Sequence, residues 1–153
     1  MRFLTDLRMP LPEALSSTAA YALNSRLRKA FAADTVDAEL IQGLIEEAQA
    51  LSVPLDTTTL EFTFRKTLEK LARAFHDQPV DPDPVSRLAR AVSLARRLPF
   101  PVVFWSIQNN CWDAMGTTLP VMRTRAAAGD EAAHAWVDQF VALCEDLSLR
   151  LPA

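Results

Sequence analysis

Apolar side chains recur at intervals of three and four residues along most of this chain, and this spacing constrains the fold more than any other feature. A helix turns once in 3.6 residues, so residues with this spacing share one side of it. The pattern is clear where Leu60, Phe64, Leu68, Leu71 and Phe75 follow one another. Three glycines and one tyrosine leave little material for a sheet-rich fold. The sequence therefore predicts an all-α protein.

Six segments have this pattern, and proline, glycine or N-capping residues separate them. Because the connections are short, we expect about six helices in a mostly antiparallel bundle. The apolar positions outside the 60–75 segment are Leu15, Ala19, Ala22, Leu23, Leu27, Ala30 and Phe31; Leu40, Ile41, Leu44, Ile45, Ala48 and Leu51; Val85, Leu88, Val92 and Ala95; Phe104, Ile107, Cys111 and Met115; and Ala133, Trp136, Val137, Phe140, Val141, Cys144 and Leu147.

Capping residues and prolines predict where these helices begin and end. Pro12 suits a first helical turn, and the segment 34–37 offers several N-caps for the second helix. We expect Pro54 to end that helix and Asp56 to cap the third. Asp83 followed by Pro84 is a typical cap and first-turn pair for the fourth, which would stop at Leu98-Pro99. In the fifth helix, Pro120 should kink or split the continuation to residue 125.

Gly129 then closes the fifth helix, and Asp130 caps the last. The proline- and aspartate-rich segment 78–84 is the clearest linker in the sequence, because each proline removes a donor and restricts the residue before it. With 153 residues and half of them hydrophobic, the chain is long enough for one helical domain spanning residues 1–153.

Charge and hydropathy bear on the partners to expect. The net charge of −3 is spread over interspersed acidic and basic residues, which gives no basic surface for nucleic acid. The basic run 26–29 alternates with apolar positions, as on a solvated helix face. No segment has the roughly 18 uncharged apolar residues of a membrane span, and the N-terminus lacks the apolar run of a signal peptide. These features favour a cytoplasmic protein with neither nucleic acid nor membrane as a partner.

Few residues suggest catalysis or metal binding. Cys111 and Cys144 are far apart and form no CxxC pair, so we expect buried free thiols, no metal and no cofactor. His76 beside Asp77 fits a helix C-terminus better than a catalytic role. His134 has no evident partner in the sequence.

Glu46-Glu47 and Glu145-Asp146 are two candidate carboxylate pairs for glycoside chemistry, in which an acid and a base or nucleophile must face each other across a sugar. Adjacent helix residues do not face each other, so a solvated helix face is the favoured interpretation of both pairs. We expect no catalytic residue in this chain.

Segment 98–112 is the one place where apolar bulk and side-chain amides concentrate. If residues 102–115 are helical, Trp105, Gln108, Asn109 and Trp112 share one side at spacings of three, four and seven. A helix so apolar should be largely buried, and buried amides need partners. Two interpretations remain open: Gln108 and Asn109 cap neighbouring backbone in the core, or the four residues contact a ligand or another domain.

Four segments carry a family resemblance: 3–7 with 9–12, 22–28 (Ala-Leu-Asn-Ser-Arg-Leu-Arg), 54–56 (Pro-Leu-Asp) and 98–109, whose Trp-x-x-Gln-Asn element follows two prolines. Together they resemble the C-terminal helical domain that follows the catalytic domain in bacterial proteins related to family 57 glycoside hydrolases. In that family a separate barrel-like domain supplies the catalytic carboxylates, and helical regions pack against it and can present aromatic residues to the substrate cleft.

The resemblance implies a non-catalytic accessory domain, excised or encoded separately from a larger carbohydrate-active protein. Its partner would be a catalytic domain of the same or a companion polypeptide, and the four residues of segment 105–112 would face that domain or a polysaccharide. Without its partner, an exposed apolar patch would favour a homodimer. The alternatives are a free-standing interaction or oligomerisation module, with Trp105 and Trp112 fully buried, and a small enzyme in which His76 or His134 meets a carboxylate in a cleft.

Overall fold

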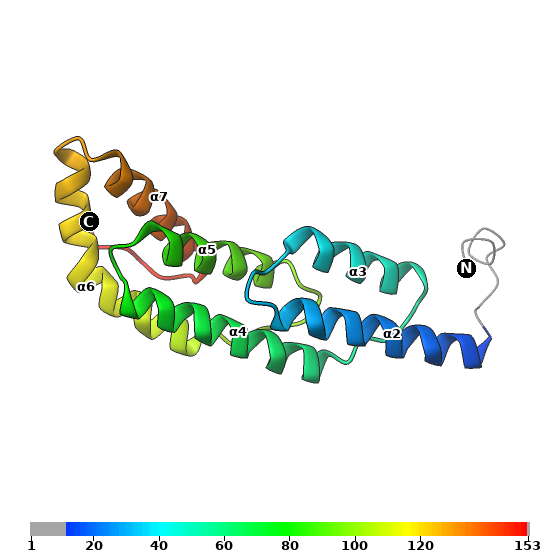
Figure 1. Cartoon of the computed structure of the whole chain (residues 1–153). Coiled ribbons are helices and arrows are strands. Elements are labelled where there is room, and N and C mark those ends of the chain that lie inside the picture. Colours follow the sequence, from blue (N-terminus) through cyan, green and yellow to red (C-terminus); the bar gives the residue numbers. More distant parts are fainter. Residues whose placement is uncertain (1–11, 153) are drawn as a thin grey trace. The chain divides into compact units, whose positions relative to one another are not determined.

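The computed structural model describes residues 12–152, and this part of the chain forms six helices with no strand. The all-α prediction is therefore confirmed. The resemblance segment at residues 3–11 lies outside the described residues. The helices are labelled in Figure 1 as α2 (Glu13–Ala32), α3 (Ala38–Ala50), α4 (Thr57–Asp77), α5 (Pro82–Arg96), α6 (Trp105–Ala127) and α7 (Glu131–Asp146).

The contacts divide the chain into two compact units, Met1–Phe64 and Arg65–Ala153. The boundary falls inside α4 and not in the segment 78–84. The first unit contains α2, α3 and the first turns of α4, whereas the second contains the remainder of α4 with α5, α6 and α7. That the whole chain behaves as one domain stays a prediction.

In the first unit, α2 packs against α3, and the two helices run antiparallel (Figure 1). Most of the buried side chains of α2 and α3 belong to the predicted apolar stripes, because each helix turns its apolar side toward the other. Phe31 at the end of α2 meets Phe64 of α4, with ring centroids 4.7 Å apart. Leu15, Ala22 and Leu40 depart from the prediction, because all three are exposed.

Pro12 is the N-cap residue of α2 and not part of its first turn, and it makes no side-chain cap. Side-chain caps begin α3 and α4, as expected. The N–H of Leu40 donates to the Asp37 carboxylate at 3.0 Å, which selects Asp37 among the candidates at 34–37. The N–H of Thr59 donates to Asp56 at 3.2 Å. Helix α3 ends at Ala50, before Pro54, and Ser52 then adopts a left-handed φ of 52°.

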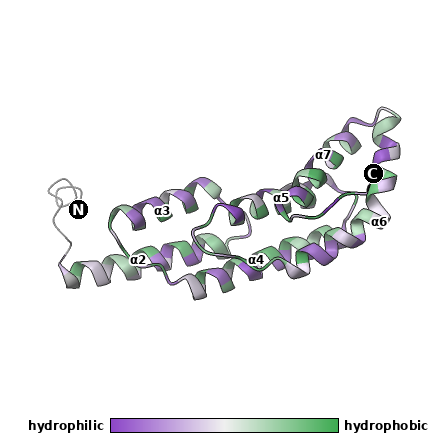
Figure 2. Cartoon of the chain, turned by 180° about the vertical axis from the view of Figure 1, so that it is seen from behind, coloured by the Kyte–Doolittle hydropathy of each residue, from purple (hydrophilic) through white to green (hydrophobic). Residues whose placement is uncertain are grey.

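The core of the second unit is an aromatic cluster between α4 and α7. Trp136 stacks on Phe140 with centroids 4.9 Å apart, and Phe75 lies 6.4 Å from the Trp136 ring. The indole Nε1 donates to the carbonyl of Pro79 at 2.9 Å, which ties α7 to the turn after α4. Helix α7 also packs on α5 and α6. Purple and green residues alternate along the helices in Figure 2, as amphipathic helices require.

The start of α5 corrects the prediction. Its N-cap is Asp81, whose carboxylate accepts from the N–H of Asp83 at 2.9 Å, and Pro82 is the first helical residue. Asp83 and Pro84, expected as cap and first-turn residue, both lie inside the helix. Proline is tolerated throughout this first turn because its missing N–H would have no helical partner there. Only residues 78–81 of the predicted linker therefore connect two helices.

Of the two outcomes expected at Pro120, a kink or a split, the helix is not split, because Pro120 lies inside the continuous α6. Figure 1 shows α6 changing direction along its length. Pro120 lies on the exposed side, where water can hydrate the carbonyl that proline leaves without a helical partner. The helix begins at Trp105, after the N-cap residue Phe104, and not at residue 102. Across residues 12–152, we find no helix with the length and apolar character needed to cross a membrane.

Candidate functional site

The loop before α6 is fixed by Arg96, the last residue of α5. Its guanidinium lies over the Phe104 ring, 5.4 Å from the centroid, which is a cation–π geometry. The same guanidinium donates to Ser148 Oγ at 3.0 Å and, through Nε, to the carbonyl of Asp146. Arg96 therefore holds the N-terminus of α6 beside the C-terminal end of α7.

One side of α6 is buried in the second unit. Ile107, Cys111 and Met115 lie in the core, as their spacing predicted. Gln108 Nε2 donates to the carbonyl of Leu147 at 3.0 Å, and Asn110 Nδ2 donates to the carbonyl of Ala72 at 3.3 Å. Two neighbouring amides thus fasten α6 to the end of α7 and to α4.

The opposite side of α6 is exposed and has little charge. Trp105 is 71% exposed and Trp112 is 67% exposed, with the exposed Asn109 between them at helical spacing. Between residues 105 and 121 the only charged side chain is that of Asp113. We call the exposed residues of this stretch the tryptophan face: Trp105, Asn109, Trp112, Asp113, Gly116, Thr117, Pro120 and Val121.

These positions correct the expectation that the helix is largely buried. Trp105, Asn109 and Trp112 do share one side, but it is the side that faces solvent, and Gln108 is turned away to bond the backbone. Of the amides expected to cap neighbouring backbone, Gln108 does so; Asn110, which the sequence analysis did not select, does the same. The spacing predicted which residues share a side, but not which side meets the core.

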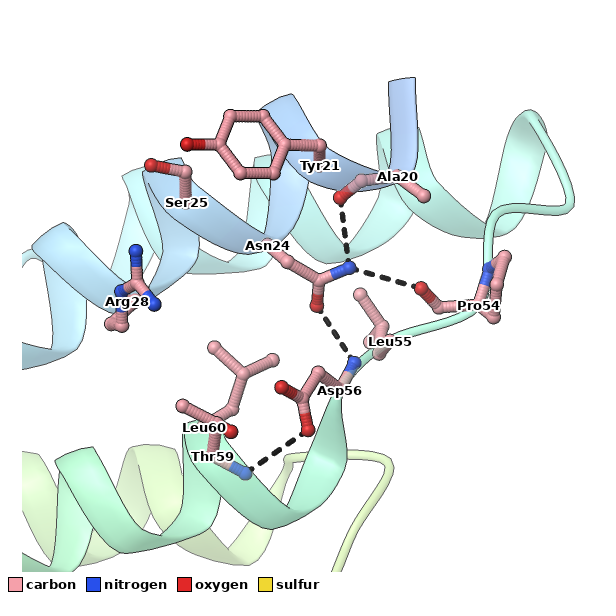
Figure 3. A pocket seen from close by; sticks show the side chains of 10 residues that line it. All are labelled: Ala20, Tyr21, Asn24, Ser25, Arg28, Pro54, Leu55, Asp56, Thr59 and Leu60. Atoms are coloured by element: carbon pink, nitrogen blue, oxygen red, sulfur yellow. Dashed lines mark hydrogen bonds between the residues drawn. The ribbon is translucent and has the colours of Figure 1, made fainter. Parts of the chain in front are cut away.

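A second candidate site is a pocket of about 410 Å³ in the first unit, between α2 and the start of α4 (Figure 3). It is lined by side chains that the sequence analysis did not select as a site. Asn24 builds it: its Nδ2 donates to the carbonyls of Ala20 at 2.8 Å and Pro54 at 3.1 Å, and its Oδ1 accepts from the N–H of Asp56 at 2.7 Å. This single amide holds the 54–56 segment against α2.

Two of the segments that carry the family resemblance meet in this pocket. Residues 22–28 contribute Asn24, Ser25 and Arg28, and residues 54–56 contribute the facing backbone and the Asp56 carboxylate. Hydrogen bonds from Thr59 and the nearby positive charge of Arg28 hold the pKa of Asp56 below its ordinary value, so the carboxylate stays ionised at neutral pH. The sequence signal that could have revealed the site is the spacing of Tyr21, Ser25 and Arg28 along one side of α2.

A third hollow, of about 330 Å³, lies at the start of α7. His134 has a partner there, contrary to the sequence analysis: its Nδ1 lies 3.2 Å from the Asp138 carboxylate, one turn further along the helix. Both side chains are more than two-thirds exposed. Such a pair is typical of a solvated helix face, where water competes for both groups.

The other residues that were considered for catalysis or metal binding lie in positions typical of structural roles. Cys111 and Cys144 are buried free thiols, as predicted, and burial raises the pKa of both, that of Cys144 to about 12. Glu47 pairs with Arg26 of α2 at 3.4 Å on the surface. His76 lies in the last turn of α4, as expected of a residue that complements the helix dipole. Among the described residues, no three His, Cys, Asp or Glu side chains are grouped as a metal site would require.

Comparisons of the chain with protein-family models, with curated proteins and with solved structures gave no match.

Proposed function

We propose that this chain is a non-catalytic helical accessory domain that docks, through the tryptophan face of α6, onto the catalytic domain of a carbohydrate-active protein related to family 57 glycoside hydrolases. The observation that carries the docking role is the exposure of Trp105 and Trp112 on one side of a helix with a single charge between residues 105 and 121. Tryptophan is enriched, and charge depleted, at the centres of protein interfaces. The carbohydrate context comes from the resemblance of segments 22–28, 54–56 and 98–109.

The anchoring of α6 supports this role. Gln108 and Asn110 fix the helix to Leu147 and Ala72, and the Arg96 guanidinium lies over the Phe104 ring just before it. The backbone that presents the two indoles is therefore held before a partner arrives. A preorganised face loses less entropy on binding, which raises the affinity that a small number of aromatic anchors can provide.

The exposure of Trp105 and Trp112 favours this proposal over a free-standing module, because that alternative would bury both indoles. That alternative also placed its binding face on the last helix, where Trp136 is fully buried and part of the aromatic core. An interaction module that uses the tryptophan face to pair with a second copy of this chain remains distinguishable by experiment.

The test uses 5-fluorotryptophan, because the chain has three tryptophans and each gives its own ¹⁹F signal. We would titrate the labelled chain with the glycoside hydrolase-like catalytic domain encoded with it. The signals of Trp105 and Trp112 should shift, while that of the buried Trp136 should not. Trp105→Ala or Trp112→Ala should weaken binding about 30-fold, since truncating an interface anchor costs on the order of 2 kcal/mol.

Leu40→Ala is the matched control, because Leu40 is an exposed apolar residue on α3, which belongs to the first unit and not to the unit that contains α6. The affinity of this variant for the catalytic domain should equal that of the wild-type chain. The proposal fails if no such catalytic domain is encoded with the chain, or if the signals of Trp105 and Trp112 do not respond to it. Concentration-dependent shifts in the chain alone, with a dimer mass by light scattering that Trp112→Ala abolishes, would instead identify the self-association module.

A further inference from the structure

The pocket of the first unit presents unused polar groups from α2. Tyr21, Ser25 and Arg28 are spaced by four and three residues, so they follow one another along one side of the helix (Figure 3). Tyr21 is 75% exposed. It is the one tyrosine in the sequence. Within residues 12–152, neither the Tyr21 hydroxyl nor the Arg28 guanidinium has a hydrogen-bond or salt-bridge partner.

The opposite wall comes from the segment that Asn24 holds in place. Figure 3 shows the Asp56 carboxylate and Thr59 across the pocket from Ser25 and Arg28, with Leu60 between the two walls. Thr59 occupies one oxygen of Asp56 by its N–H, and the carboxylate has further lone pairs for another donor. Leu60 is almost fully buried and gives the pocket an apolar base.

This set of groups favours a ligand that carries hydroxyl groups over a simple ion or a purely apolar molecule. A carboxylate and a guanidinium share the pocket, so a phosphate or other anion would be repelled by Asp56 and a cation by Arg28. A purely apolar ligand would bury both charges without hydrogen bonds. A sugar satisfies both, because its hydroxyls donate to a carboxylate and accept from a guanidinium, while its C–H face packs on an aromatic ring. The volume of about 410 Å³ is within the range of small-molecule sites.

We propose that the pocket lined by Tyr21, Ser25, Arg28 and Asp56 binds a neutral sugar, with the Tyr21 ring as the stacking surface and Arg28 and Asp56 as the groups that hold its hydroxyls. Asn24 is a positioning residue, since its amide is used by Ala20, Pro54 and Asp56. The inference is independent of the docking function of α6, because the pocket lies entirely within the first unit.

The single tyrosine makes the test specific. The chain labelled with 3-fluorotyrosine has one ¹⁹F signal, and it reports on this pocket alone. On titration with glucose, maltose and cellobiose, that signal should shift and saturate for at least one sugar. Arg28→Gln and Asp56→Asn should each weaken the response about tenfold, since each removes a hydrogen bond to a charged group. Asparagine also caps helices well, so Asp56→Asn keeps the start of α4.

Arg26→Gln is the matched control: it is two residues from Arg28 on the same helix but pairs with Glu47 of α3. It should bind the sugar as the wild-type chain does. Circular dichroism melts of all three variants establish that they are folded. A signal that does not move with any of the three sugars overturns the proposal, and so does a shift that persists in Arg28→Gln and Asp56→Asn. A saturable shift with inorganic phosphate but not with sugar would also overturn it.

Discussion

Asn24 of α2 and Asp56, thirty-two residues later, are joined by a 2.7 Å hydrogen bond from the Asp56 N–H to the Asn24 side-chain oxygen. The same side chain donates to the carbonyls of Ala20 and Pro54. One amide thus satisfies three backbone groups and sets the spacing between α2 and the start of α4. Side-chain amides are suited to this, because each has two donor hydrogens and an acceptor oxygen.

Asn24→Ala should therefore destabilise the chain. The substitution removes three hydrogen bonds, although water can replace part of them at this partly exposed site, so we expect a loss of about 1–2 kcal/mol in the free energy of unfolding. Urea denaturation followed by circular dichroism measures it. Arg26→Ala, on the same helix, is the control and should change stability by less than about 0.5 kcal/mol, because surface ion pairs contribute little. Equal stabilities of the two variants would contradict the structural role of Asn24.

The three tryptophans should differ in their contribution to stability. Trp136→Phe loses the hydrogen bond to Pro79 and part of the ring that stacks on Phe140, so it should cost about 2–3 kcal/mol. Trp105→Phe is the same chemical change at an exposed position and should stay within about 0.5 kcal/mol of the wild type. Urea unfolding of both variants gives the comparison. A large loss in Trp105→Phe would mean that the tryptophan face is part of the core.

The core of the helices was predictable from the sequence, because a repeat of 3.6 residues is a local property. Phe64, Leu68, Leu71 and Phe75 were expected on one face of α4, and all four are buried. Boundaries were less predictable where several caps compete: both Asp81-Pro82 and Asp83-Pro84 are good starts for a helix, and the earlier pair is used.

The candidate sites were only half predictable. Spacing placed Trp105, Asn109 and Trp112 on one side of a helix, but whether that side meets solvent depends on which apolar side packs in the core, and Ile107, Cys111 and Met115 take that place. The pocket of the first unit was not predicted at all. It exists because Asn24 reaches backbone groups some thirty residues away, and the local spacing of Tyr21, Ser25 and Arg28 does not show which segment lies opposite them.

The buried thiols predict a loss of stability at alkaline pH. Burial raises the pKa of Cys144 to about 12 from 9.0 and raises that of Cys111 further. Above about pH 9 the unfolded chain releases these protons while the folded chain keeps them, so the free energy of unfolding falls as pH rises from about 9 toward 12. Stability from this source is complete below pH 9.

The measurement is urea unfolding at pH 7 and pH 10 for the wild type and for the double variant Cys111→Ala/Cys144→Ala. The informative quantity is the difference between the two proteins, because they differ only in the two thiols. The wild type should lose more stability between the two pH values than the double variant. Identical pH dependence would contradict the effect of thiol burial.

Two glycines should respond in opposite directions to the same substitution. Gly43 lies on the exposed side of α3 with open space around it, so Gly43→Ala should stabilise the chain by about 0.5–1 kcal/mol through higher helix propensity. Gly129 ends α6 with a φ of 92°, and the N–H of the next residue, Asp130, returns to the carbonyl of Arg125 at 3.1 Å. This left-handed turn favours glycine.

Gly129→Ala should therefore destabilise the chain by about 1–2 kcal/mol, because an L side chain is strained at that φ even where nothing blocks its Cβ. Thermal melts of both variants against the wild type give the signs directly. Gly129→Asn is the informative control: asparagine tolerates the left-handed region better than alanine, so it should recover part of the loss. An unchanged melting temperature in Gly129→Ala would mean that the turn between α6 and α7 is not held in this conformation. It would then also contradict the cap at the start of α7, in which the N–H of Ala133 donates to Asp130.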